Sequence, residues 1–252
     1  MKINNDQELV CGINAVKEII SIRPKSVMKL LLHDDKQSKR ISLLTSLAKD
    51  KRIETTVREG KFFEENFNDE NHQGVAILCN KRLEENETFL EKLLEKKDLL
   101  ILILDHLTDP HNVGACLRSA AAAGADAVIA PKNRSCHLTP TVRKISSGGS
   151  ELLPFIIVTN LNRTIEKISD SGVKVIGATA ATGQNYTEID MKGSVAFIIG
   201  SEDNGLKRLT AEKCDHMASI KMPGRIESLN ASVTAGIILF EHVRQNNHPK
   251  LN

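Results

Sequence analysis

Several residue types are scarce in this chain, and each scarcity argues against a class of function. The 252 residues include no Trp and a single Tyr, Tyr186, and aromatic residues make up 3% of the sequence. Proteins that bind single strands by stacking bases need exposed aromatic rings, so the composition argues against that mode of recognition. The formal net charge is only +2, which neither requires nor excludes a nucleic-acid partner.

Cysteine pairs, long apolar runs and glycine fingerprints are also missing. The five cysteines form no Cys-x-x-Cys pair, so we expect no zinc and no other resident metal. Their odd number, together with a polar N-terminus, predicts a reducing cytoplasm. The longest apolar runs have only strand length, so no membrane span is expected. No Gly-x-Gly-x-x-Gly follows a strand, and Gly205 precedes Leu206 instead of Lys, which excludes the usual dinucleotide and triphosphate loops.

Alternating strand and helix patterns from Leu99 onward predict an α/β domain over residues 99–252, built on a mostly parallel sheet. The run Leu99–Leu104 is wholly apolar, which is typical of a strand buried on both faces of such a sheet. A helix is expected to begin after Thr139 as N-cap, with Pro140 in its first turn. The predicted strands are Leu99–Leu104, Ala127–Ala130, Phe155–Val158, Val173–Ala178, Val195–Gly200 and Met217–Lys221.

The segment before this domain predicts a smaller α/β unit over residues 1–80. The apolar spacing favours helices over Val10–Ile22, which would end before Pro24, and over Ser38–Lys49. The charge-rich segment 81–98 is expected to be a linker that includes a short helix. The predicted strands of the smaller unit are Met28–Leu32, Ile53–Val57 and Gly74–Leu78, and the apolar positions of the linker helix are Leu90, Leu93 and Leu94.

A Pro-Gly loop near the C-terminus leads directly into an apolar helical pattern. Pro223 and Gly224 precede Ser228, Asn230 and Ser232, which lie where the loop becomes helix. Unpaired backbone N–H groups collect at such a junction and favour partial negative charge, so the segment suits ligand binding. Taken alone, an ordinary N-cap and glycine turn before a helix explains the pattern more simply.

A second polar loop follows the strand that ends at Asp105. Asp109 and Pro110 indicate a turn, and Asn112 is the expected N-cap of the Ala-rich helix that comes next. Arg118 is the one large polar group of that helix, which argues against a role as mere solvated surface. The carboxyl ends of parallel strands meet at one edge of a sheet, where ligand sites collect.

A third polar loop follows the apolar strand Val195–Gly200. Taken in their order along the chain, the three loops resemble the three motifs of the SpoU (TrmH-type) family of RNA 2'-O-ribose methyltransferases. The resemblance covers roughly Leu99 to Gln245, and Lys221 departs from it because relatives usually carry proline there. The matching residues are Asn112 and Arg118 in the first motif, Gly200 and Glu202 in the second, and Ser228, Leu229 and Asn230 in the third.

This resemblance implies a cofactor, a fold and a set of site residues. S-adenosylmethionine would donate the methyl group, and the C-terminal domain would contain a trefoil knot, which no spacing in the sequence shows. The implied catalytic residues are Asn112, Arg118, Glu202, Ser228 and Asn230. The implied cofactor contacts are Thr179, Gly200, Ile220 and Leu229. Without the resemblance, Ile220 and Leu229 would be interpreted as simple core residues.

The resemblance also implies partners. Residues 1–80 would bind the RNA substrate, and the chain would form a homodimer with each active site near the subunit interface. Ile237, Ile238 and Val243 on the last helix would serve either that contact or the core. The implied reaction is 2'-O-methylation of a guanosine ribose in 23S rRNA. The alternatives are a tRNA or another rRNA site, and a non-catalytic RNA-binding assembly factor, against which the intact polar motif residues argue.

Overall fold

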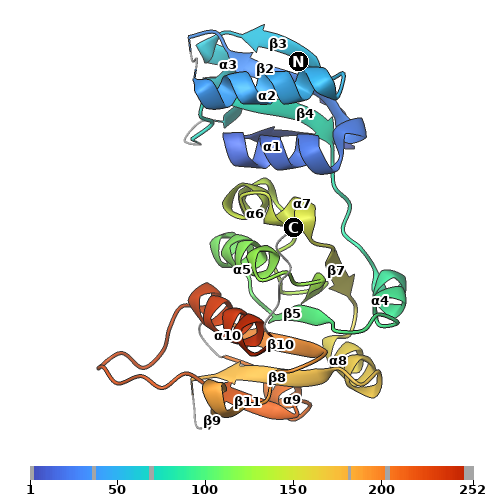
Figure 1. Cartoon of the computed structure of the whole chain (residues 1–252), viewed down its shortest axis with the longest axis vertical. Coiled ribbons are helices and arrows are strands. Elements are labelled where there is room, and N and C mark those ends of the chain that lie inside the picture. The colour runs from blue at the N-terminus through green and yellow to red at the C-terminus, as the bar shows by residue number, and fades with distance from the viewer. Residues whose placement is uncertain (1–2, 36–37, 68–70, 181–182, 202–204, 247–252) are drawn as a thin grey trace. The chain divides into compact units, whose positions relative to one another are not determined.

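The chain folds into two compact α/β units that divide between Leu83 and Glu84 (Figure 1). A computed structural model describes residues 3–35, 38–67, 71–180, 183–201 and 205–246. No helix within these residues is long and apolar enough to cross a membrane. The α/β class and the parallel sheet of the second unit agree with the sequence prediction.

The first unit is a four-stranded sheet with strand order β1-β4-β2-β3 across its described residues. Strand β4 runs antiparallel to both of its neighbours, and β2 pairs in parallel with β3. Ser38 caps helix α2, where its side chain accepts a hydrogen bond from the Ile41 N–H at 3.2 Å. The elements are β1 (Gln7–Cys11), α1 (Ile13–Ile22), η1 (Pro24–Ser26), β2 (Val27–His33), α2 (Lys39–Asp50), β3 (Glu54–Arg58), α3 (Gly60–Phe67) and β4 (Val75–Asn80).

The prediction of a helix over Val10–Ile22 was wrong in its first part. Val10 belongs to strand β1, where it lies opposite Ile77 of β4. Gly12 has a φ of 96°, a backbone conformation that glycine adopts readily, and it turns the chain between β1 and α1. The apolar spacing continues from strand to helix across this turn, so periodicity alone does not show the boundary.

The second unit is built on a parallel sheet, which in the described part of the chain has seven strands in the order β7-β6-β5-β10-β8-β11-β9. Each neighbouring pair is parallel. Helix α6 has the predicted Thr139 cap and Pro140 in its first turn. The elements are α4 (Glu87–Leu93), β5 (Leu100–Asp105), α5 (Pro110–Ala122), β6 (Ala127–Pro131), α6 (Pro140–Ile145), α7 (Gly149–Leu152), β7 (Phe155–Val158), α8 (Leu161–Asp170), β8 (Lys174–Thr179), β9 (Gln184–Asn185), η2 (Tyr186–Glu188), β10 (Val195–Gly200), α9 (Arg208–Ala211), β11 (His216–Ser219) and α10 (Ala231–Asn246).

Helices cover both faces of this sheet, which explains why its central strands are wholly apolar (Figure 1). Along β5, Leu102 and Leu104 join the core that α5 and α10 cover. Ile101 and Ile103 point to the opposite face and join the core that α4 and α8 cover. The polar loops that follow the strands therefore collect at the carboxyl edge of a rigid, fully buried sheet.

The short helix predicted within segment 81–98 is present as α4, and it belongs to the second unit. Leu90 and Leu93 are buried in the core beneath α8. Just before α4, the Glu85 N–H donates to the Phe155 carbonyl at 2.8 Å, and the Ile157 N–H donates to the Glu85 carbonyl at 2.9 Å. Glu85 and helix α4 thus pack against strand β7.

Candidate active site

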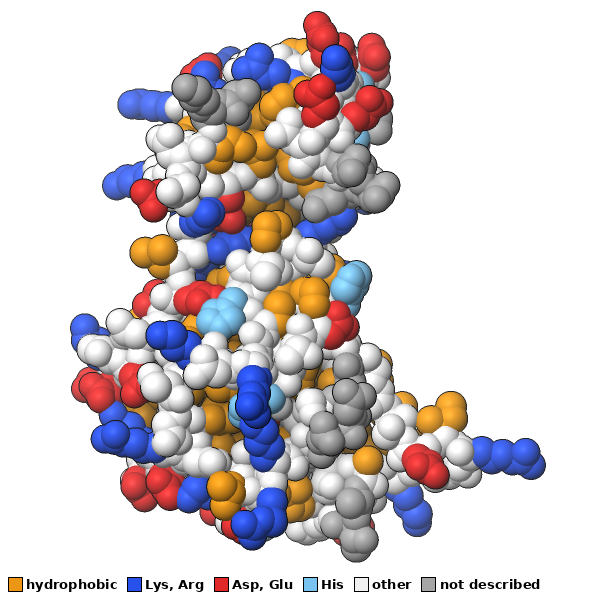
Figure 2. Space-filling model, turned by 180° about the vertical axis from the view of Figure 1, so that it is seen from behind, with side chains coloured by type: hydrophobic (Ala, Val, Ile, Leu, Met, Phe, Trp, Pro, Cys, Tyr) orange, Lys and Arg blue, Asp and Glu red, His pale blue; other side chains and the backbone are white. Residues whose placement is uncertain are grey.

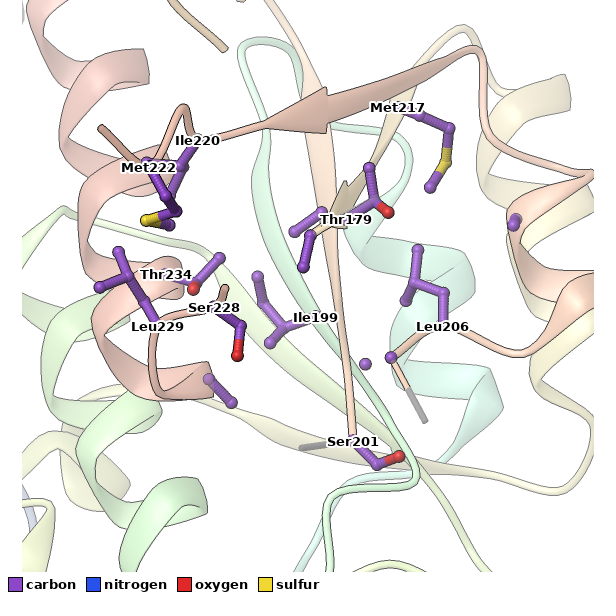
Figure 3. A pocket seen from close by; sticks show the side chains of 16 residues that line it. Thr179, Ile199, Ser201, Leu206, Met217, Ile220, Met222, Ser228, Leu229 and Thr234 are labelled. Carbon is purple, nitrogen blue, oxygen red and sulfur yellow. The ribbon is translucent and has the colours of Figure 1, made fainter. Parts of the chain in front are cut away.

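A pocket of about 460 Å³ opens where strands β8, β10 and β11 end and helix α10 begins (Figure 3). This is the carboxyl edge of the sheet, where ligands bind in open parallel α/β folds. The lining combines apolar side chains with hydroxyl groups and contains no charged side chain among the residues described. It consists of Ala178, Thr179, Ala180, Ile199, Gly200, Ser201, Gly205, Leu206, Ala211, Met217, Ile220, Met222, Ser228, Leu229, Ala231 and Thr234.

All four residues predicted to contact a cofactor lie in this one pocket. Thr179 ends β8 and Gly200 ends β10, while Ile220 follows β11 and Leu229 precedes α10. Figure 3 shows Ile220 and Leu229 on one side of the pocket and Thr179 across from them. Leu229 is 36% exposed, so it is not a simple core residue, whereas Ile220 is half-buried and both packs against the core and lines the pocket.

Gly200 lies where the backbone folds most tightly around the pocket. A Cβ atom at this position would lie 2.1 Å from the carbonyl carbon of Gly205. The loop between them is closed by two hydrogen bonds, from the Ser201 N–H to the Gly205 carbonyl at 3.1 Å and from the Gly205 N–H to the Ser201 carbonyl at 2.8 Å. Only glycine permits this close approach, which leaves main-chain groups as the pocket wall.

Asn112 is not the N-cap of α5, contrary to prediction. Asp109 holds that position, since its side chain accepts from the His111 N–H at 3.0 Å and Pro110 occupies the first turn. Asn112 lies within the first turn, and its Nδ2 donates to Asp109 Oδ2 at 2.9 Å. This bond, followed by the one from His111, holds the pKa of Asp109 below its usual range, so the carboxylate is ionised at neutral pH.

A side-chain hydrogen bond joins the first and third motifs. Asn230 Nδ2 donates to Asn112 Oδ1 at 2.9 Å, across 118 positions of sequence. Asn230 Oδ1 in turn accepts from the Ser232 N–H at 2.9 Å, so Asn230 caps helix α10 as the sequence suggested for this junction. The chain Asp109–Asn112–Asn230 fixes the entrance of α10 beside Ser228, which lines the pocket.

Neither Arg118 nor Lys221 lines the pocket. Arg118 is exposed on α5 and is not part of the pocket lining. Glu202 lies outside the described residues. Lys221, which departs from the family pattern, is exposed and does not line the pocket. Its neighbours Ile220 and Met222 do.

Sequence reasoning missed several lining residues because they look like ordinary core. Met217 and Leu206 lie together on one side of the pocket, and Met222 and Thr234 border its other side from the loop and from α10 (Figure 3). The sequence did offer a signal for Ser201, since it directly follows Gly200 at the end of an apolar strand.

Among the described residues, one group of three metal-ligating residue types lies close together in the first unit. It consists of His33, Asp34 and Asp35.

Comparison with known proteins places the motifs in a family. Residues 99–240, which include the pocket, match the SpoU rRNA Methylase family. The chain belongs to the SpoU rRNA methylase family. Residues 9–84 match the substrate-binding domain of RNA 2'-O ribose methyltransferases, so both units have counterparts in this SpoU architecture.

Curated relatives of this SpoU protein extend over nearly its whole length. The 23S rRNA (guanosine-2'-O-)-methyltransferase RlmB of Coxiella burnetii is 40% identical over 242 residues, which cover 95% of this chain and 96% of that one. RlmB of Escherichia coli is 36% identical over 239 residues, covering 94% and 98% of the two chains.

Solved structures share the fold of this SpoU chain. The SpoU methyltransferase AviRb from Streptomyces viridochromogenes, in complex with the cofactor AdoMet, matches with a TM-score of 0.77 at 23% identity, covering 95% of this chain and 90% of that one. An RNA 2'-O ribose methyltransferase matches with a TM-score of 0.78 at 22% identity, covering 95% and 89%.

Proposed function

We propose that this SpoU protein transfers a methyl group from S-adenosylmethionine to the ribose 2'-OH of a guanosine in 23S rRNA. The observation that carries the proposal is the hydrogen bond between Asn112 and Asn230, which brings two distant family motifs together beside the pocket. The RlmB relatives, matched along nearly the full chain, support rRNA and guanosine as the substrate. A ribose 2'-OH exists in RNA and not in DNA, so the reaction itself selects the nucleic acid.

The pocket fits the proposed cofactor. Its volume of about 460 Å³ lies within the range of small-molecule sites. Main-chain groups around Gly200, with Ile220, Leu229 and Thr179, would hold an adenosine between backbone polar atoms and apolar side chains. S-adenosylmethionine supplies a methyl group that is already activated by its sulfonium. The protein therefore needs mainly to align donor and acceptor, which contributes roughly 7–11 kcal/mol in well-oriented systems.

In this proposal Arg118 acts on the RNA. Guanidinium groups keep their proton in proteins, so Arg118 is a poor base. It is suited to a two-pronged grip on an RNA phosphate and to stabilising the alkoxide that develops on the ribose. Asn112 and Asn230 would orient the sugar, Ser228 would hydrogen-bond to cofactor or substrate, and Glu202 would orient Arg118.

We further propose a homodimer that forms over the exposed side of α10. Val233 and Phe240, seven positions apart on one side of this helix, are 48% and 49% exposed. Of the residues left open by sequence, Ile238 is only 1% exposed and belongs to the core. Helix α5 packs beside α10, with Ser119 near Gly236, so a dimer over α10 would bring Arg118 toward the shared face.

The proposal also assigns RNA recognition to the first unit and a trefoil knot to the second. The first unit would select the RNA, because residues 9–84 match a substrate-binding domain and none of its described residues lines the pocket. A trefoil knot in the second unit is supported by the order of its strands. The chain passes from β10 to β11 on the far side of β8, and α10 then returns to pack on α5 and β10.

Two alternatives carry different expectations. A tRNA or another rRNA ribose as target would leave the whole site unchanged and alter only the modified nucleotide. A non-catalytic RNA-binding factor has no need for the Asp109–Asn112–Asn230 chain beside a pocket. None of the five cysteines forms a disulfide bond, which fits the proposed cytoplasmic location.

Cofactor binding tests the proposal. Isothermal calorimetry of the purified chain in the presence of a chelator should show binding of S-adenosylmethionine and of its demethylated product. NAD, which shares the adenosine, should bind much more weakly, because the chain has no Gly-x-Gly-x-x-Gly loop for a pyrophosphate. Binding of NAD, with no binding of S-adenosylmethionine or of its demethylated product, would refute the proposed function.

A further inference from the structure

A second pocket lies at the same edge of the sheet, where strands β5, β6 and β7 end. Its volume is about 500 Å³, and helix α9 and the start of α8 close its sides. Neither the motifs nor the proposed cofactor account for it. Its lining residues are His106, Pro131, Asn133, Arg134, Thr159, Asn160, Leu161, Asn162, Lys207, Leu209 and Thr210.

The lining of this second pocket has the chemistry of an anion site. It contains two cations, Lys207 and Arg134, together with amide and hydroxyl side chains, and its described residues include no carboxylate. Within the described residues, neither Lys207 nor Arg134 forms an ion pair with an acid. On the face drawn in Figure 2, most Lys and Arg side chains are interspersed with acidic and polar ones. Lys207 and Arg134 are therefore two cations around one pocket for which no acidic partner is found among the described residues.

Lys207 is held in place by a chain of side chains that begins inside the sheet. Asp105 is only 1% exposed, and its Oδ2 accepts from the backbone N–H of Lys207 at 3.1 Å. Its Oδ1 contacts His106 Nδ1, and His106 Nε2 lies 2.7 Å from Lys207 Nζ. An ammonium can only donate, so Nε2 accepts from Lys207 and Nδ1 carries the proton toward Asp105. The buried carboxylate thereby orients the imidazole, and the imidazole positions the ammonium at the pocket.

Both of the other basic lining residues have strained backbones. His106 has a φ of 61° and Arg134 a φ of 56°, in the left-handed region that residues other than glycine adopt uncommonly, His less rarely than Arg. Such strain persists where the surrounding structure imposes it, and it concentrates at ligand sites. Here the two strained residues follow neighbouring strands and line the same pocket.

We propose that this second pocket binds a phosphodiester of the RNA strand next to the target ribose. The inference rests on the proposed function. The two pockets share a wall, since Leu206 lines the first and Lys207 the second. Asp105 also lies opposite Gly200 in the pairing of β5 with β10. A strand whose ribose faces the first pocket would therefore pass its neighbouring phosphate over Lys207 and Arg134.

The pocket is better suited to a polymer than to a free anion. Both cations are exposed, and phosphate contacts from exposed Lys and Arg side chains add up along a polyanion. The described lining of the first pocket is uncharged, and the second pocket presents the positive charge that a phosphodiester requires. A free nucleoside monophosphate presents the same phosphate and serves as the competing ligand in the test.

The test compares Arg134→Ala, Lys207→Ala and their double variant with the full wild-type chain. Lys207→Ala keeps the backbone N–H that bonds to Asp105, so the loop is preserved. Arg208→Ala is the matched control, because Arg208 neighbours Lys207 but pairs with Glu212 and does not line the pocket. The readouts are methyl transfer to unmodified 23S rRNA transcript, its salt dependence, and S-adenosylmethionine binding.

Each single variant should raise the KM for the transcript about tenfold, the scale of one charge-assisted hydrogen bond. The kcat at saturating RNA and the cofactor affinity should stay near wild type. The slope of log KM against log salt should fall by about 0.7 for each phosphate that the variant no longer neutralises. His106→Gly, which relieves the backbone strain but frees Lys207, should raise KM severalfold without lowering Tm, as expected of a positioning residue.

An unchanged KM and salt slope in the double variant would overturn the inference while leaving the proposed function intact. Binding of guanosine monophosphate that depends on Arg134 and Lys207, with RNA kinetics unaffected, would also overturn it and assign the pocket to a free nucleotide. The proposed function fails in a different way, namely if the wild-type chain neither binds S-adenosylmethionine nor methylates the transcript.

Discussion

Replacing Arg118 with alanine should slow methyl transfer at least about a hundredfold in single-turnover assays, the scale observed when one transition-state donor is removed. The physical reason is the loss of the planar guanidinium that grips the phosphate and stabilises the developing alkoxide. Affinity for S-adenosylmethionine should change little, because Arg118 is exposed on α5 and does not line the cofactor pocket.

Two further variants make the Arg118 result specific. Arg118→Lys should recover little activity, since an ammonium keeps the charge but cannot make the two-pronged contact. Lys92→Ala removes an exposed cation from α4, on the opposite face of the sheet, and should act like wild type. Near-normal turnover of Arg118→Ala would remove Arg118 from the active site and shift attention to Glu202 or Ser228.

Gly200→Ala should weaken binding of S-adenosylmethionine at least about tenfold. The added methyl would lie 2.1 Å from the Gly205 carbonyl carbon and 2.4 Å from the Leu206 nitrogen. These are backbone atoms, so the loop itself must shift, and overpacking of this kind costs roughly 1–3 kcal/mol. Calorimetry measures the affinity, and circular dichroism checks that the fold persists.

Gly224→Ala is the matched control for this substitution. Gly224 belongs to the loop before α10, and a Cβ there would meet no atom within 4 Å. Its affinity for the cofactor should remain within about twofold of wild type. If Gly200→Ala bound as tightly as Gly224→Ala, the loop after β10 would not be a wall of the cofactor site.

The strands of the second unit were predictable because burial on both faces leaves an unbroken apolar run. Phe155–Val158 matches β7 at both ends, and Val195–Gly200 matches β10. Elements that lack such a run were missed, namely helix α3 and the two-residue strand β9. In α3, Phe63 and Phe67 are buried four positions apart, a helical spacing that the sequence does offer.

Five of the residues named from the family resemblance line one pocket, but the way the site is assembled could not be predicted from sequence. Thr179, Gly200, Ile220, Ser228 and Leu229 share one pocket because the carboxyl ends of parallel strands meet at one edge. No local pattern indicates that Asn230 donates to Asn112, because the bond spans 118 positions.

Local chemistry also misled the prediction of the α5 cap. Asp109 and Asn112 are both good N-caps, and Pro110 in the first turn of the helix decides in favour of Asp109. The placement of Arg118 away from the pocket lining is a tertiary result that helix spacing does not reveal.

Mapping of ribose 2'-O-methylation in total RNA, from cells with and without the gene, tests the central claim most directly. The account predicts that one guanosine of 23S rRNA loses its methyl group in the deletion strain and regains it with the wild-type gene but not with Arg118→Ala. Identical methylation maps in the two strains, or a change confined to tRNA, would contradict it.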